Sequence, residues 1–287
     1  MKKHDDFEIW LHENDELVKI HGANIISREP LRSWPLSVVE RVAFNDGASR
    51  IYKAFRNLPV ETEFYRAVQS RHIPKVFYNY SDGDNHWLLF ENVDGRHPVN
   101  LNRNEMLNLG CQVRQIIDEF SSAEKLYRYD LSAKGYGSFV SATIELLTKL
   151  RKEEKFNTVD EKVISRIEKA LSHTEVKRTV HGKCVMLHGD LKCDNIIIRP
   201  DGSLVIIDWQ NILFGPEDID AYTLMATQNI DPVPVVGIGS EILRLALLIK
   251  WFADCADRWL PYWASGYERM IADIEKQIQA IVGNSGL

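Results

Sequence analysis

The sequence predicts an α+β protein with a small strand-rich lobe followed by a larger, mainly helical lobe. Its 287 residues exceed the usual size of one compact domain. Up to about residue 97, short apolar runs alternate with turn signals, whereas from residue 98 apolar residues recur every three or four positions. We therefore expect an N-lobe over residues 1–97, with a hinge at about residues 91–97, and a C-lobe over residues 98–287.

The N-lobe is predicted from a hairpin, a helix and a further strand. The runs VVERVAF (38–44) and SRIYKAF (49–55) flank Asn45-Asp46-Gly47, residue types that tolerate the positive φ of tight turns. VETEFYRAV (60–68) has apolar residues at four-residue spacing, which is typical of one helical face. HWLLFEN (86–92) then reads as a strand that leads into the hinge.

The C-lobe is predicted from helical periodicity. The segment NEMLNLGCQVRQIIDEF (104–120) repeats apolar residues every three or four positions, as a helix packed on one side requires. FVSATIELLTKL (139–150) and VISRIEKAL (163–171) show the same pattern, and helical segments at about 240–260 and 266–282 follow.

Composition excludes several classes of protein. A formal charge of -6, from 35 basic and 41 acidic residues, lacks the electrostatic footprint of a nucleic-acid-binding protein. The four cysteines form no CxxC pair, which argues against a disulfide framework and favours a reducing compartment. Acidic residues in MKKHDDFEIWLHEND take the place of a signal peptide's apolar stretch, and Arg244 and Lys250 interrupt the longest apolar segment. We therefore expect a cytoplasmic protein with no nucleic-acid or membrane partner.

One stretch, VMLHGDLKCDNIIIRPDGSLVIIDWQ (185–210), places polar residues between short apolar strands. A loop from His188 to Asp194 joins the first two strands, and the turn Pro200-Asp201-Gly202 sends LVIID back as a third. This path brings Asp208 near the loop with Asp190 and Asn195. Such oxygen ligands suit Mg²⁺, which binds one or two carboxylates together with substrate phosphates.

The same loop carries candidates for the chemical step. A carboxylate that does not bind metal can accept the proton of an attacking hydroxyl, and Asp190 is the candidate for this role. Lys192 can place a cation beside a transferring phosphoryl group, whose charge is spread over three oxygens.

HGDLKCDN followed by IIDWQ resembles the catalytic loop and metal motif of the aminoglycoside phosphotransferase and choline kinase-like family, relatives of protein kinases. The matching residues are His188, Gly189, Asp190, Asn195 and Asp208, and the resemblance continues through GPEDIDAYTL. It implies a bilobal protein kinase-like fold in which Asp190 is the base and Asn195 and Asp208 hold Mg²⁺.

A kinase also needs a cation on the nucleotide phosphates, held by a helix glutamate. Lys53 lies on the same strand face as two apolar residues, so it should face a cleft or be paired, because burying an unpaired ammonium is costly. Glu61 is the expected partner and Glu63 the competing choice; an exposed strand lysine is the structural alternative.

The rest of the nucleotide site is implied by resemblance. LLFENVDG resembles the family hinge, with the backbone from Glu91 to Val93 meeting a purine edge, which implies ATP as the donor and GTP as the alternative. The segment before it departs from the family, because no glycine occurs from Ala23 to Asp46. The main-chain amides of Ser33 and Ser37 remain candidates for a phosphate contact.

Two features bear on the acceptor, and both have structural alternatives. The acidic residues Glu217, Asp218 and Asp220 could attract a cationic sugar, or could stabilise the start of a helix; Asp220 is expected to be an anchor. The aromatic stretch KWFADCADRWLPYW (250–263) could hold a quaternary ammonium or pack as core.

The sequence therefore predicts an ATP-dependent phosphotransferase that acts on a hydroxyl of a small-molecule acceptor, such as an aminoglycoside-like compound, an amino alcohol or a sugar. A catalytically silent nucleotide-binding or partner-binding module is the alternative, favoured by the glycine-poor segment and opposed by the retained site residues.

Overall fold

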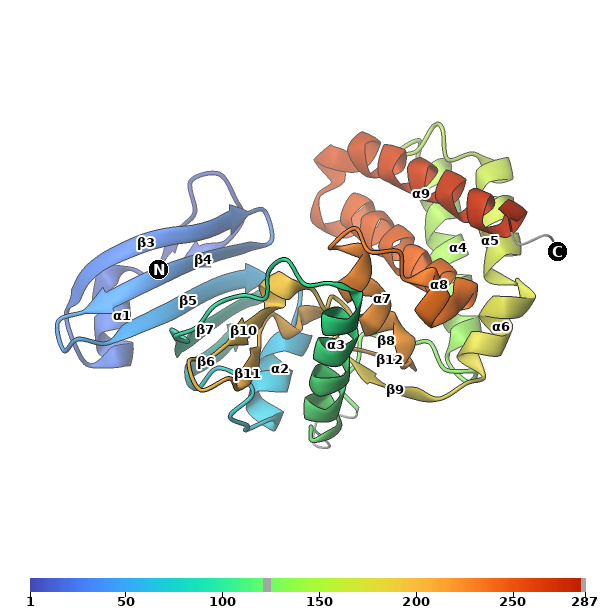
Figure 1. Ribbon diagram of the computed structural model, residues 1–287. Coiled ribbons are helices and arrows are strands. Elements are labelled where there is room, and N and C mark those ends of the chain that lie inside the picture. Colours follow the sequence, from blue (N-terminus) through green and yellow to red (C-terminus); the bar gives the residue numbers. More distant parts are fainter. Residues whose placement is uncertain (121–124, 285–287) are drawn as a thin grey trace. The chain divides into compact units, whose positions relative to one another are not determined.

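The computed structural model describes residues 1–120 and 125–284 (Figure 1). The chain forms two compact units, each built from separate segments. Unit 1 comprises Met1–Leu101, Gln112–Leu126 and Cys193–Asn211; unit 2 comprises Asn102–Cys111, Tyr127–Lys192 and Ile212–Leu287. The loop with Asp190 therefore belongs to unit 2, whereas Asn195 and Asp208 belong to unit 1. The lobe boundary expected near residue 97 stays a prediction.

Unit 1 is built on a five-stranded antiparallel sheet with the order β3-β4-β5-β7-β6 (Figure 1). The strands are β3 (Ile25–Trp34), β4 (Ser37–Phe44), β5 (Ser49–Arg56), β6 (Val76–Asp82) and β7 (Asn85–Glu91). The predicted hairpin is confirmed: β4 and β5 pair around a turn in which Gly47 takes φ 84°, a conformation that glycine adopts without a steric penalty. Helix α2 (Val60–Ala67) is confirmed as well.

The two faces of this sheet differ because side chains alternate along a strand. On one face Val42, Tyr52 and Trp87 pack against Ile9 and Leu17 from the N-terminal segment. That segment contains β1 (Lys2–Lys3), β2 (Trp10–Leu11) and α1 (Asn14–His21). Lys53 follows Tyr52 and therefore points to the opposite face.

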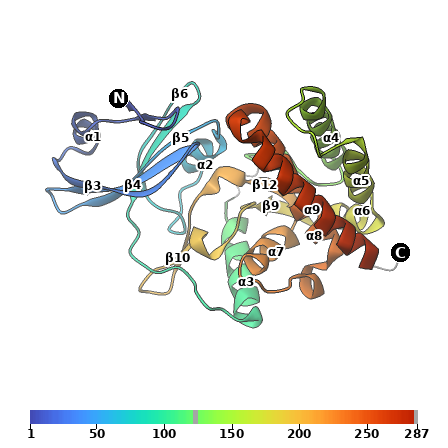
Figure 2. The same cartoon turned by 90° about the horizontal axis from the view of Figure 1, so that it is seen from above.

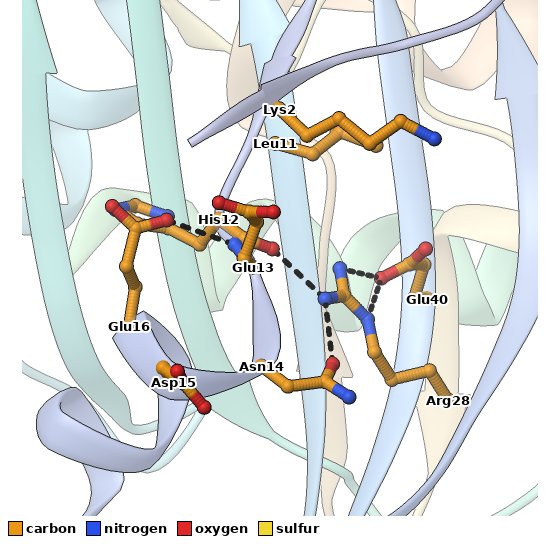
Figure 3. A pocket seen from close by; sticks show the side chains of 9 residues that line it. All are labelled: Lys2, Leu11, His12, Glu13, Asn14, Asp15, Glu16, Arg28 and Glu40. Carbon is orange, nitrogen blue, oxygen red and sulfur yellow. Dashed lines mark hydrogen bonds and ion pairs between the residues drawn. The ribbon is translucent and has the colours of Figure 1, made fainter.

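An arginine fastens the N-terminal segment to the sheet (Figure 3). Arg28 donates from Nε to Glu40 Oε2 at 2.8 Å, and from Nη1 to the main-chain oxygen of His12 at 2.8 Å and to Asn14 Oδ1 at 3.3 Å. In the depression that Figure 3 shows around these residues, Glu16 Oε2 also accepts the main-chain N–H of Glu13 at 2.9 Å.

The glycine-poor segment folds as a strand and a tight turn. Trp34 pairs with Ser37 across Pro35-Leu36, and Ser33 pairs with Val38. Both serines proposed for phosphate contact therefore belong to the β3-β4 ladder, and the Ser37 side chain is buried, with its Oγ accepting a bond from Trp34 Nε1 at 2.5 Å.

Unit 1 also contains the short hairpin of β10 (Ile196–Ile198) and β11 (Leu204–Ile206), with 3-10 turns at Cys193–Asn195 and Trp209–Asn211. Strand β11 ends earlier than the LVIID pattern indicates, so Asp208 lies beyond the strand rather than at its last position. Its backbone turns out of the ladder there, with φ 66°.

Unit 2 is mainly helical around one hydrophobic core (Figure 2). It contains α4 (Tyr136–Lys152), α5 (Glu161–Leu171), α6 (Thr174–Val180), α7 (Asp218–Ala226), α8 (Val233–Asp254) and α9 (Ala264–Asn284). Helix α9 packs along α8 and α5. Helix α3 (Arg103–Asp118) begins in unit 2 and ends in unit 1.

A small sheet lies beside these helices. Strand β12 (Leu213–Pro216) pairs with β9 (Cys184–Leu187) and with β8 (Tyr129–Asp130). The predicted helical segments and the mixed α+β class are confirmed by this architecture. Within residues 1–120 and 125–284, no helix combines the length and apolar character that a bilayer crossing requires.

Candidate active site

A buried lysine in unit 1 joins two carboxylates. Lys53 Nζ donates to both carboxylate oxygens of Glu61, at 2.8 and 2.7 Å, and to Asp208 Oδ1 at 2.7 Å. The expected pairing with Glu61 rather than Glu63 is confirmed, and the exposed-lysine alternative is wrong, because the Lys53 side chain is only 9% exposed. Asp208, far away in sequence, completes the cluster.

The electrostatics of this cluster follow from burial. Burial by itself lowers the pKa of Lys53, but the carboxylates of Asp208 and Glu61 outweigh it, so the pKa is raised and the ammonium stays charged. Burial raises the pKa of Glu61 to about 7, against the opposing effect of the Lys53 charge.

Asp208 is held in a conformation that few residue types adopt. Its φ of 66° lies in the left-handed region, where aspartate and asparagine are enriched among non-glycine residues. Its neighbours are fixed: Ile207 N–H donates to Asn195 O at 3.0 Å, and the Trp209 ring stacks on Phe64 with centroids 4.2 Å apart. Such local strain persists only where surrounding structure enforces it, as at many functional sites.

The two predicted metal ligands lie in the same unit and on adjoining turns. Asn195 is buried in the turn before β10, and its main-chain oxygen holds the residue before Asp208. Gln210 Nε2 donates to Asp208 Oδ2 at 3.5 Å. One carboxylate and one amide oxygen fit a Mg²⁺ ion that also binds water and phosphate. No group of three or more His, Cys, Asp or Glu side chains suited to a metal occurs among the described residues.

In the predicted hinge, Glu91 is bonded to the chain itself through both its main chain and its side chain. Glu91 N–H donates to Lys75 O at 2.8 Å, and its side chain accepts from Arg199 Nη1 at 2.9 Å. The Glu91 main-chain N–H is thus taken by the sheet. Within the described ranges, no hydrogen bond reaches the main-chain N–H of Val93, so that donor is available to a ligand.

The predicted base Asp190 has its charged neighbours within unit 2. Lys192 Nζ lies 3.0 Å from Asp190 Oδ2, and Arg244 Nη2 lies 3.7 Å from Asp190 Oδ1. Asp190 N–H donates to His188 Nδ1 at 3.3 Å, and the His188 side chain is fully buried. The predicted base therefore has a cation on each side of its carboxylate.

Asp220 anchors this loop, as the sequence predicts. Its buried carboxylate accepts the main-chain N–H of His188 at 2.8 Å and that of Gly189 at 2.9 Å. The aspartate stands in the first turn of α7, and its bonds reach the two residues immediately before Asp190. The other acidic candidates differ: Glu217 pairs with Lys183 at 2.7 Å, and burial raises the pKa of Asp218.

Arg244 is the residue that sequence reasoning missed. It lies on α8 with its side chain 12% exposed, and its Nε donates to Thr223 Oγ1 at 2.8 Å. Burial lowers its pKa, while Asp190 opposes that effect; an arginine remains charged nevertheless. The signal was present, since an arginine inside the apolar run EILRLALLIKW needs a buried partner.

The aromatic stretch of unit 2 holds a cation from the chain itself. The Arg128 guanidinium lies 4.9 Å from the Trp251 ring and 4.8 Å from the Trp259 ring, and it pairs with Asp254 at 3.2 Å. These two tryptophan rings therefore pack inside the protein, which is the alternative to ligand binding that the sequence offered for this stretch. Tyr262 and Trp263 are exposed.

Comparison with known families identifies the chain. Residues 48–241 match the model of a family described as the phosphotransferase enzyme family. The chain belongs to this family. The match spans Lys53, the loop with Asp190 and the turn with Asp208, and it confirms the resemblance seen in the sequence. The protein is therefore a phosphotransferase.

Solved structures confirm the kinase-like fold of this phosphotransferase. Macrolide 2'-phosphotransferase MphH from Brachybacterium faecium aligns at TM-score 0.56 and 14% identity, over 90% of this chain and 95% of that one. Aminoglycoside 2'-phosphotransferase-IIIa, solved as a GDP complex, aligns at TM-score 0.56 and 15% identity, over 91% of this chain and 96% of that one. A putative fructosamine-3-kinase from Thermobifida fusca aligns at TM-score 0.54 and 13% identity, over 93% of this chain and 98% of that one. No curated protein matches the chain.

Proposed function

We propose that this phosphotransferase transfers the γ-phosphoryl group of ATP to a hydroxyl group of a small-molecule acceptor. The observation that carries the proposal is the buried cluster of Lys53, Glu61 and Asp208, in which one lysine bonds to both carboxylates. A lysine with a purely structural role needs one carboxylate partner. A lysine that binds a nucleotide phosphate has to release Asp208, and Glu61 then keeps its ammonium in place. GTP is the alternative donor, and the cytoplasm is the proposed location.

The residues of unit 1 act on the nucleotide in this proposal. Lys53 binds the phosphates, and the main chain of Glu91 and Val93 meets the purine, with the Val93 N–H as donor. Asn195 and Asp208 hold Mg²⁺, which neutralises phosphate charge when bound. Asp208 lies beyond the end of β11, and its Oδ1 is 2.7 Å from Lys53 Nζ, which suits a metal ligand beside the phosphates.

The residues of unit 2 act on the acceptor. Asp190 accepts the proton of the attacking hydroxyl, and Lys192 stabilises the transferring group. Arg244 is a positioning residue, because its guanidinium reaches Asp190 from a second helix and limits the carboxylate's rotation. Asp220 fixes the main chain of the same loop.

The acceptor class remains to be measured. The neighbours' names include a macrolide phosphotransferase, an aminoglycoside phosphotransferase and a putative fructosamine kinase, which supports a hydroxylated small molecule as acceptor. The internal use of Trp251 and Trp259 by Arg128 disfavours a quaternary ammonium at that place.

A silent nucleotide-binding module is the second candidate. The two-residue turn between β3 and β4 favours it, because this turn lacks the glycines with which kinase relatives cover the phosphates. The two candidates differ in turnover, not in nucleotide binding.

The test is Mg²⁺-dependent ADP release from ATP in the presence of aminoglycosides, macrolides, amino alcohols, glycated amines and simple sugars. Asp190→Asn is measured beside the wild type, and we expect a loss of about 10²- to 10⁴-fold in turnover with little change in nucleotide affinity. An unchanged rate with a confirmed acceptor would contradict the role of Asp190. Absent turnover with intact ATP binding would favour the silent module.

A further inference from the structure

Unit 1 contains a cavity that shares only Glu91 with the residues assigned above to the nucleotide. Its volume is about 610 Å³, within the range of about 300–1,000 Å³ that small-molecule sites occupy. Three elements form its walls: the segment after α2, the end of β7 and the β10-β11 turn. Lys53, Asn195 and Asp208 do not line it.

The floor of this cavity is apolar. Tyr65, Val68, Ile73 and Pro74 line it and are nearly buried, and Val76 adds a partly exposed aliphatic surface. Apolar side chains around a cavity provide the surface that an organic ligand would cover.

The rim of the cavity is cationic. Arg71 donates from Nε to His72 Nε2 at 3.2 Å, and Lys75 Nζ lies 5.1 Å from the Phe77 ring centre. Neither side chain has a carboxylate partner in the part of the chain that the structure describes. Arg199 adds a third cation.

The acids at the rim leave this positive charge in excess. Glu91 accepts one bond from Arg199 Nη1 at 2.9 Å, and Asp201 accepts both the N–H and the hydroxyl of Ser203. The rim therefore has three cations and two carboxylates, and one of these carboxylates, Asp201, bonds within the β10-β11 turn.

We propose that this cavity is a second ligand site, which binds a small organic anion through Arg71, Lys75 and Arg199. An apolar part of the ligand lies on Val68 and Ile73, and its phosphate or carboxylate group meets the cations. Arginine can meet either group with two parallel hydrogen bonds. The anion competes with Glu91 for Arg199.

The cavity connects to the residues that hold the nucleotide. Burial raises the pKa of the Tyr65 phenol, and the main-chain N–H of Asp208 acts against that rise. Tyr65 also follows Glu61 by one turn of α2, and Glu61 holds Lys53. A ligand against Tyr65 and Glu91 therefore contacts two elements of the nucleotide site. This regulatory consequence rests on the proposed function, whereas binding to the cavity does not.

The first test measures binding alone. Phenyl phosphate and benzoate are titrated into the whole protein by calorimetry, without nucleotide or acceptor. We expect saturable binding in the millimolar range or tighter, and a loss of at least about tenfold in Arg71→Gln/Lys75→Gln, equivalent to about 1.4 kcal/mol. Stronger binding of phenyl phosphate would assign a phosphate ligand; stronger binding of benzoate would assign a carboxylate.

One control variant locates the site. Lys19→Gln removes an exposed cation on α1 outside the cavity and should bind like the wild type. Absence of saturable binding, equal binding by the double variant, or an equal loss in Lys19→Gln would overturn the proposal. Thermal unfolding confirms that each variant is folded.

The second test measures coupling. Saturating phenyl phosphate should change the ATP dissociation constant of the wild type by about fivefold or more, and should leave that of Arg71→Gln/Lys75→Gln unchanged. An unchanged constant in the wild type would refute the regulatory role. If phenyl phosphate binds but ATP does not, the cavity stands and the proposed function fails.

Discussion

Asp220→Asn removes the anchor of the loop that carries Asp190, without touching a proposed catalytic group. The Asp220 carboxylate accepts two buried main-chain N–H groups, from His188 and Gly189, at 2.8 and 2.9 Å. Asparagine keeps one acceptor oxygen but places an NH₂ group against the other N–H. One bond to a charged acceptor is lost, and the other becomes a neutral bond.

The magnitude follows from these two bonds. A hydrogen bond to a charged group contributes about 1.5–3 kcal/mol, and a neutral one about 1 kcal/mol. We therefore expect Asp220→Asn to lower the free energy of unfolding by about 2–4 kcal/mol. For a protein of this size the corresponding fall in Tm is roughly 3–7 °C.

Activity should fall more than stability alone explains. The two anchored residues directly precede Asp190, so a released loop misplaces the proposed base. A shift of about 1 Å in such a group can cost about 10²-fold in rate. We expect kcat to fall by that order at a temperature where Asp220→Asn is fully folded, while the nucleotide dissociation constant is unchanged.

Asp218→Asn is the matched control, because it changes the same residue type in the same helical turn. Burial raises the pKa of Asp218, so above that pKa its charge costs folding free energy, and asparagine removes this cost. Its free energy of unfolding from urea titration should stay within about 0.5 kcal/mol of the wild type or rise. Equal unfolding free energies for Asp218→Asn and Asp220→Asn would refute the anchoring role.

Three further predictions concern the two units separately. Since the pKa of Glu61 is about 7, nucleotide affinity should weaken by up to about tenfold from pH 8 to pH 6 as Glu61 becomes neutral, and Glu61→Gln should flatten that difference in a fluorescence titration. Asp208→Asn should weaken Mg²⁺-dependent ATP binding in calorimetry, and Asp208→Ala should in addition lose about 1 kcal/mol of unfolding free energy, because alanine tolerates φ 66° poorly; full Mg²⁺-ATP affinity in both would contradict metal binding. Arg244→Gln should lower kcat by about 10- to 100-fold with unchanged nucleotide KM, and Arg244→Lys should restore part of it; a wild-type kcat in Arg244→Gln would exclude a positioning role beside Asp190.

The local elements of this fold could be predicted from the sequence because their signals are local. The Asn45-Asp46-Gly47 turn predicts the hairpin before any tertiary contact is known, and apolar spacing predicts α2 and α9. The pairing of Lys53 with Glu61 could also be predicted, since a lysine on an apolar strand face needs a nearby acid.

Other parts of the site could not be predicted because they join distant residues. The bond from Lys53 to Asp208 spans 155 positions, and the contact of Arg244 with Asp190 depends on where α8 packs. The predicted extent of LVIID was too long, because the left-handed turn at Asp208 is enforced by Trp209 packing on Phe64. No pattern of neighbouring residues encodes that stacking.

The sequence by itself determined the family and hence the class of chemistry, and it predicted the residues that would carry that chemistry. The spacing of Asp190, Asn195 and Asp208 is a property of the chain, and so is the family match over residues 48–241. Only the tertiary structure decided which charged side chains lie close enough to interact. It placed Lys53 between two carboxylates, set Arg244 beside Asp190, and gathered Arg71, Lys75 and Arg199 around one cavity. The physical reason is that electrostatic interactions depend on distance and burial, and these are set when remote segments pack.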